Sequence, residues 1–162
     1  MYEFRVNDKI YKVKFGYGVL YQSNLIDKVI AVSAGNPDNP ADTVKNMMGI
    51  TAELLLAGLQ KKHKDEFGYD WDSESERKAM VLKACDLIDD YEDEHRNDEV
   101  ADGETPPNGF TLFNELQAEL EKNGFLSMIT RSGAEALSEQ GSTVVPLDHQ
   151  KKRGRRPAGE TV

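Results

Sequence analysis

The residues that could do chemistry are concentrated in the acidic stretch 86–104, DLIDDYEDEHRNDEVADGE. Its carboxylates and His95 could bind a metal ion, and two carboxyl groups held in different environments could act as an acid and a base. However, no pair has an informative ligand spacing, and nothing in the sequence indicates a cleft around these side chains. We interpret the stretch as a solvated helix end that continues into a flexible acidic loop, which would attract a basic partner.

A second group of acidic residues, from Asp70 to Glu76, alternates along the chain in the manner of a calcium-binding loop. An EF-hand loop needs glycine at its sixth position and a bidentate glutamate at its twelfth. Counted from Asp70, these positions hold Ser75 and Val81. The sequence therefore does not predict a calcium site.

Nucleotide binding and nucleophilic catalysis also lack their sequence motifs. Gly16-Tyr17-Gly18 follows a predicted strand, but GYGVLY lacks the third glycine of a dinucleotide loop, and no lysine follows as in a Walker loop. No serine lies in a GxSxG elbow, and no HExxH occurs. The single cysteine, Cys85, lies among apolar positions of a predicted helix, so we expect a buried, unreactive thiol. We predict a protein that is not an enzyme and uses no cofactor or metal.

The composition indicates a globular protein with polar segments attached. The chain has 162 residues, a formal net charge of -9 and a pI near 4.9, with 38% hydrophobic and 30% charged residues. A strongly negative domain repels nucleic acid and anionic membranes. The sequence has no apolar run of about eighteen residues and no signal-peptide pattern, so we expect a soluble protein with no membrane partner.

The longest apolar stretch, residues 43–63, predicts a central helix. Its apolar residues recur at steps of three and four, which places them on one helical face, whereas a strand needs a step of two. Leu56 and Ala57 widen this face, so we expect the helix to be covered on more than one side. Asp42 or Thr43 is the expected cap. The stripe consists of Val44, Met47, Met48, Thr51, Leu54, Leu55, Gly58 and Leu59.

Elements on both sides of this helix complete the predicted fold. Alternating apolar and charged residues predict a β-hairpin over residues 2–15, with Asn7-Asp8 at the turn because both residues tolerate a positive φ. Apolar spacing predicts helices over about 19–30 and over 110–123. The face of the last helix is expected to consist of Phe110, Phe113, Leu116 and Leu120, with Leu112 beside them.

A further helix is predicted to begin at about residue 74, because Ser73 and Glu76 form a capping box. Together the elements predict a mainly α fold: a small helical domain of about four helices with an N-terminal β-hairpin, over residues 1–130. Beyond Arg131 the apolar density falls, and we expect 131–162 to be a flexible, disordered tail with a basic end.

That basic end reverses the charge sign of the chain. RGRRP, residues 153–157, is close to the core of an AT-hook, whose arginines enter the minor groove of A·T-rich DNA. An extra arginine before the proline departs from that pattern. We favour a tail that binds acidic surfaces, including the chain's own 86–104 stretch, over one that binds DNA. The candidate contact residues are Lys151, Lys152, Arg153, Arg155 and Arg156.

Three stretches together resemble the tail assembly chaperones of long-tailed bacteriophages of Gram-positive hosts. They are FRVNDKIYKVKFGYGVLYQSNLI at 4–26, a hairpin leading into a helix; ELLLAGLQKKH at 53–63; and LFNELQAELEKNGFL at 112–126. The resemblance spans about residues 3–130 and depends on the combination, its order and its spacing. The acidic stretch and the tail have no counterpart in it.

The resemblance implies a non-catalytic function in the host cell cytoplasm. Such proteins bind the tape measure protein, keep its helices from aggregating, help recruit tail tube subunits, and leave before the virion is complete. Many are made in two lengths by programmed frameshifting, and this chain would correspond to the shorter one. Self-association around the long partner is a further expectation. The alternatives are a structural tail or head–tail completion protein, and a DNA-associated regulator that uses the basic tail.

A chaperone for apolar helices needs an apolar groove of its own. The candidate groove residues are the methionines and leucines of the central helix, because methionine adapts to varied surfaces. The alternative is that all of them are core residues. They are Met47, Met48, Leu54, Leu55 and Leu56.

Overall fold

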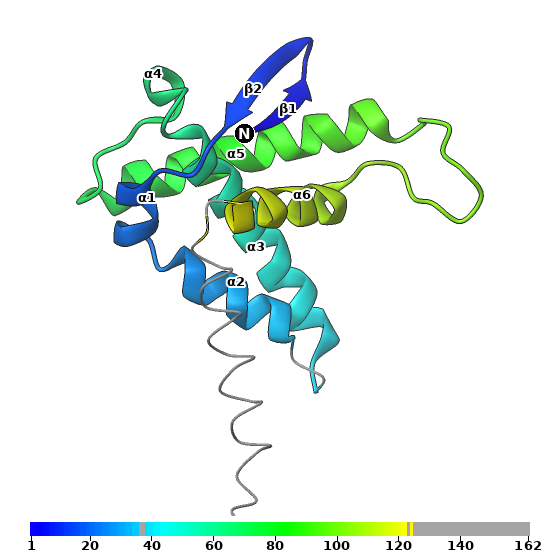
Figure 1. Ribbon diagram of the computed structural model, residues 1–162, viewed down its shortest axis with the longest axis horizontal. Helices are drawn as coiled ribbons and strands as arrows, with labels where there is room; N and C mark the ends of the chain where they lie inside the picture. Colours follow the sequence, from blue (N-terminus) through cyan, green and yellow to red (C-terminus); the bar gives the residue numbers. More distant parts are fainter. Residues whose placement is uncertain (36–37, 123, 125–162) are drawn as a thin grey trace, which may run out of the picture. The chain divides into compact units, whose positions relative to one another are not determined.

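The computed structural model describes residues 1–35, 38–122 and 124, which all belong to one compact unit (Figure 1). This part is mainly helical with an N-terminal antiparallel hairpin, which confirms the predicted fold class. The expected tail, with Lys151 to Arg156, lies outside the described residues. The elements are β1 (Tyr2–Val6), β2 (Lys9–Val13), α1 (Tyr17–Gln22), α2 (Leu25–Ala34), α3 (Pro40–Leu59), α4 (Lys64–Phe67), α5 (Glu74–His95) and α6 (Gly109–Lys122).

The hairpin has the predicted turn and the predicted buried face. Asn7 and Asp8 have φ values of 53° and 57°, the conformation that a two-residue type I′ turn requires. The antiparallel register pairs Tyr2 with Val13 and Val6 with Lys9. Alternate side chains of both strands therefore lie on the same face of the hairpin. These side chains, Phe4, Val6, Tyr11 and Val13, are buried.

Helix α3 is the centre of the described residues, since it contacts β2, α2, α4, α5 and α6. Its two halves differ. From Ile50 to Leu59 every side chain except Glu53 is buried, because apolar residues occur all round the helix. The first half is mostly exposed, and α2 lies beside it (Figure 1). The cap is Asn39, whose side chain accepts a hydrogen bond from the Asp42 N–H; the prediction of Asp42 or Thr43 was wrong.

The hairpin contacts α3 through its backbone at Gly58. The Lys14 N–H donates a hydrogen bond to the Gly58 carbonyl over 2.9 Å. A Cβ atom at position 58 would lie 2.3 Å from Cγ1 of Val13, which is closer than real side-chain contacts. Glycine is therefore required for the hairpin to reach the helix.

Other helix boundaries show what periodicity alone could not predict. The predicted helix 19–30 is divided into α1 and α2 at Ser23-Asn24, and the Ser23 side chain donates a hydrogen bond to the Val19 carbonyl. The extra turn α4 places Phe67 in the core. Helix α5 begins as predicted, with Ser73 accepting from the Glu76 N–H. Phe110 is a correction: it was expected on the buried face of α6 but is exposed.

The acidic stretch is not simply a solvated helix end. Helix α5 continues to His95, and its carboxylates accept hydrogen bonds from other elements. Asp90 accepts a hydrogen bond from the side chain of Asn7, at the hairpin turn, over 2.7 Å. Glu94 accepts one from the Asn7 backbone N–H over 2.6 Å. Glu92 accepts from the Gly109 N–H over 2.6 Å. The acidic end of α5 thus holds the hairpin turn and the start of α6.

The Gly58 contact gives the first prediction. We expect Gly58→Ala to lower the free energy of unfolding by about 1–3 kcal/mol, the usual cost of overpacking, even though alanine is the better helix former. The matched control is Gly49→Ala in the same helix, where a Cβ atom would meet nothing within 4 Å. In this control the free energy of unfolding should rise by up to about 1 kcal/mol. Urea unfolding measures the free energy of unfolding of both variants. Equal changes in that free energy at the two positions would contradict the close contact at Gly58.

An ion pair between the hairpin and α4 gives a pH-dependent prediction. Glu66 accepts a hydrogen bond from Nζ of Lys9, which lowers the pKa of the Glu66 carboxyl. A carboxyl whose pKa is lower in the folded state adds stability above its unfolded pKa and loses it as the pH falls through the folded pKa. We therefore expect Glu66→Gln to reduce stability slightly near neutral pH, and the difference to disappear in acid.

Urea unfolding of both chains between about pH 7 and pH 2.5 measures this difference. Glu74→Gln is the control, because among the described residues Glu74 pairs with the exposed Lys78 alone, one turn along the same helix. A deficit for Glu66→Gln that stayed constant across this range would contradict the assignment.

Candidate partner-binding site

An open groove of about 620 Å³ lies between the first half of α3, α5 and the start of α6. Most of its surface is apolar, and we call it the α3–α5–α6 groove. Its apolar side chains are Val44, Met47 and Met48 from α3, Cys85 and Ile88 from α5, and Phe110 from α6.

Three of these side chains are unusually exposed for apolar residues. Met48 is 69% exposed, Val44 58% and Phe110 56%. Single exposed apolar residues are common on proteins, but a contiguous apolar patch marks an interaction site. Because these three side chains line one groove, they form the strongest candidate for a binding surface in the described part of the chain.

Polar contacts fix the end of the groove where α6 begins. The Asn108 side chain accepts hydrogen bonds from the N–H groups of Phe110 and Thr111, over 2.9 and 3.1 Å, and so caps the helix. The Glu92 carboxylate on α5 accepts a hydrogen bond from the backbone N–H of Gly109, the residue before Phe110. A Cβ atom at Gly109 would lie 3.0 Å from the Glu92 carboxylate, so the small residue permits this approach. The position of Phe110 is therefore set by α5.

The structure separates the five predicted groove residues into two groups. Met47 is half-buried and Met48 exposed, and both line the groove. Leu54, Leu55 and Leu56 are buried, which agrees with the alternative that they are core residues. The three leucines belong to the half of α3 that the hairpin, α5 and α6 cover, so they do not reach the surface. The basic residues 151–156 lie outside the described residues.

Sequence reasoning missed the α5 and α6 side of the groove. Phe110 was assigned to a buried helical face and Cys85 to the interior, whereas Phe110 is exposed. Cys85 is half-buried and lines the groove. Burial raises the pKa of its thiol, and the nearby carboxylates of Asp89 and Asp86 raise it further.

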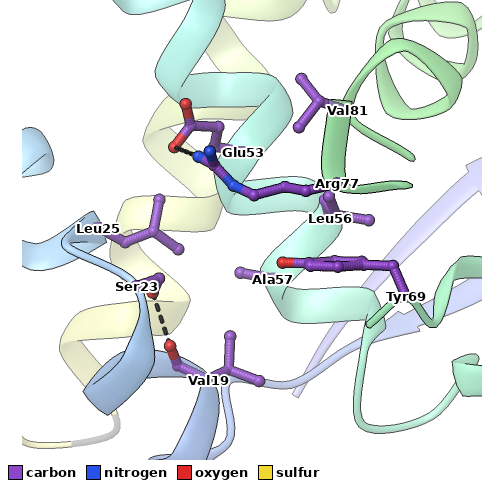
Figure 2. A pocket seen from close by; sticks show the side chains of 9 residues that line it. All are labelled: Val19, Ser23, Leu25, Glu53, Leu56, Ala57, Tyr69, Arg77 and Val81. Carbon is purple, nitrogen blue, oxygen red and sulfur yellow. Dashed lines mark hydrogen bonds and ion pairs between the residues drawn. The ribbon is translucent and has the colours of Figure 1, made fainter. Parts of the chain in front are cut away.

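Two other hollows are weaker candidates. A cavity of about 20 Å³, room for one water molecule at most, lies beside Tyr69. Figure 2 shows the side chains that line it. In its wall Glu53 pairs with Arg77 over 3.3 Å, and Glu53 also pairs with Lys28 over 2.6 Å, so these charges link α2, α3 and α5. The charged residues that line a groove of about 380 Å³ between α2 and α3 are Lys28, Lys45 and Glu53.

Two of the three histidines, His63 and His95, have structural contacts that the sequence did not predict. The Lys12 N–H donates a hydrogen bond to Nε2 of His63 over 2.9 Å, and the ring packs edge-on against Tyr11. Nδ1 of His95 lies 2.6 Å from the Asp98 carboxylate. Within the described ranges, no three or more His, Cys, Asp or Glu side chains are grouped so as to hold a metal ion.

None of the helices in the described part of the chain has the length and apolarity that a membrane span requires. Comparison with protein-family models, with curated proteins and with solved structures found no match. A functional assignment therefore depends on the α3–α5–α6 groove and on the sequence resemblance.

Cys85 offers a test of the groove in the free protein. Because its pKa is raised, less of the thiol is ionised at neutral pH, and the thiolate is the reactive form. We expect alkylation by iodoacetamide to be slower than for an exposed cysteine near neutral pH, and to become faster as the pH rises through the raised pKa.

Mass spectrometry of the alkylated chain over a pH series measures this reaction. In 6 M urea, about the concentration that unfolds a small domain, the rate should match that of a free thiol. A rate in the folded protein equal to the unfolded rate at neutral pH would contradict the half-buried position.

Proposed function

We propose that the protein is a tail assembly chaperone of a long-tailed bacteriophage. It binds apolar helical segments of the tape measure protein in the α3–α5–α6 groove and helps recruit tail tube subunits. The observation that supports this most is the contiguous exposure of Val44, Met48 and Phe110 along one groove. The sequence resemblance over residues 3–130 supplies the identity of the partner.

The groove has properties that suit an apolar helix. Helix-in-groove recognition places the apolar face of one helix between others, with contacts about one turn apart. Val44, Met48 and Thr51 lie at such steps along α3 and line the groove. Flexible methionine side chains repack around different partners, which a chaperone for a long and varied protein requires.

Charge supports the same role. The chain carries a net charge of -9, and net charge keeps proteins soluble by mutual repulsion. A complex in which an acidic domain covers an apolar segment stays dispersed until the segment is handed on. We further propose that several copies coat one tape measure protein in the host cytoplasm, and that they leave before the virion is complete.

The groove residues give a direct test of partner binding. We expect Met48→Asp and Phe110→Asp each to weaken binding of a tape measure segment about tenfold or more, because a buried charge opposes an apolar contact. Both side chains are exposed, so folding should be retained. The control is Leu82→Asp, a change at a side chain of α5 that is 65% exposed and is not among those lining the groove. Fluorescence anisotropy with a labelled segment measures the affinities.

Circular dichroism of the same variants separates binding from folding. Leu56→Asp should unfold the domain, since Leu56 is 3% exposed and lies in the core. Equal binding by the native chain, Met48→Asp and Phe110→Asp would exclude the groove. Detection of the protein in purified virions by mass spectrometry would instead support the alternative of a structural tail or head–tail completion protein.

A further inference from the structure

We infer that the occupant of the α3–α5–α6 groove is an amphipathic helix that carries a lysine or arginine beside its apolar face, and that Asp89 selects this cation. The inference rests on the proposed function, because it specifies the chemistry of the segment that the groove binds. Asp89 is a specificity determinant in this proposal, while the apolar side chains supply the contact area.

Asp89 is the available charge in the groove. It follows Ile88 on α5, and both line the groove with Cys85 one turn earlier. Asp89 is exposed and makes no hydrogen bond or ion pair with the described residues. Glu92, the other carboxylate in the groove, accepts the hydrogen bond from the Gly109 N–H. A partner's cation therefore meets a carboxylate that is not already used by the fold.

The α3 side of the groove does not supply the cation. Its side chains are Val44, Met47 and Met48, with Gly49 and Thr51. The nearest lysine along this helix, Lys45, lies about 100° round the helix from Val44. Lys45 lines the second groove, between α2 and α3, together with Lys28. Helix α3 thus lies between the α3–α5–α6 groove, whose charged residues are acidic, and a groove whose charged residues are Lys28, Lys45 and Glu53.

This separation gives the groove selectivity as well as affinity. When an apolar helix covers the groove, the carboxylate of Asp89 loses part of its water, and a cation on the partner offsets that loss. An acidic helix would place like charges together and be rejected, although its apolar face fits equally well.

The test uses three helical peptides of about five turns, with leucines at steps of three and four on an alanine and glutamine background. They differ at one position beside the apolar face, which holds lysine, glutamine or glutamate. We expect the lysine peptide to bind the full chain about two- to fivefold more tightly than the glutamine peptide, the range for a partly exposed ion pair. The glutamate peptide should bind most weakly.

Two variants with the same change of net charge locate the effect. Asp89→Asn should remove the preference for lysine over glutamine. Asp86→Asn should keep it, because Asp86 is an exposed carboxylate on the same helix that is not among the residues lining the groove. Binding is measured by anisotropy, and protection of Cys85 from iodoacetamide reports occupation of the groove itself.

The outcomes distinguish this inference from the proposed function. Equal affinities for the lysine and glutamine peptides, or equal effects of Asp89→Asn and Asp86→Asn, would overturn the role of Asp89 while leaving an apolar helix site. Failure of every peptide to bind and to protect Cys85 would overturn both. Protection of Cys85 that rises with protein concentration without peptide would show that a second copy of the chain occupies the groove, which also overturns the inference.

Discussion

The close backbone contact between β2 and α3 at Gly58 is the constraint on which the described fold depends. An isolated two-stranded hairpin is marginally stable in water, so the buried faces of β1 and β2 need a surface to cover them. Helix α3 provides this surface at Gly58, because any side chain there would collide with Val13. The Lys14 N–H donates a hydrogen bond to the Gly58 carbonyl at the same place. The register of the hairpin and the burial of the second half of α3 are fixed together.

That contact divides α3 into a buried half and a mostly exposed half. The half from Ile50 onward is covered by the hairpin, α5 and α6, and supplies the stability of the domain. The earlier half extends beyond this core and retains the exposed apolar side chains Val44 and Met48. Because the two halves use different residues, the proposed partner contact at Met48 is separate from the core that Leu54, Leu55 and Leu56 form.

Local patterns in the sequence predicted the elements but not the contacts between them. Strand alternation, the Asn7-Asp8 turn and the Ser73 cap are decided by neighbouring residues, and the structure has all three. The apolar stripe of α3 could not show that Leu55 is core while Met48 is surface, because both fit the same helical period. That difference depends on where α5 and α6 cross α3. The roles of Asp90, Glu92 and Glu94 depend on residues far along the chain.

The loop between α5 and α6 is tethered at both ends. His95 pairs with Asp98 at one end, and Asn108 caps α6 at the other, with a turn at Ala101–Glu104 between them. The entropy of closing a loop grows only slowly with its length, so added residues near Gly103 would leave the two anchored ends in place. The loop is therefore a position where a fluorescent protein or an epitope can be inserted to follow the chain in cells without altering the groove.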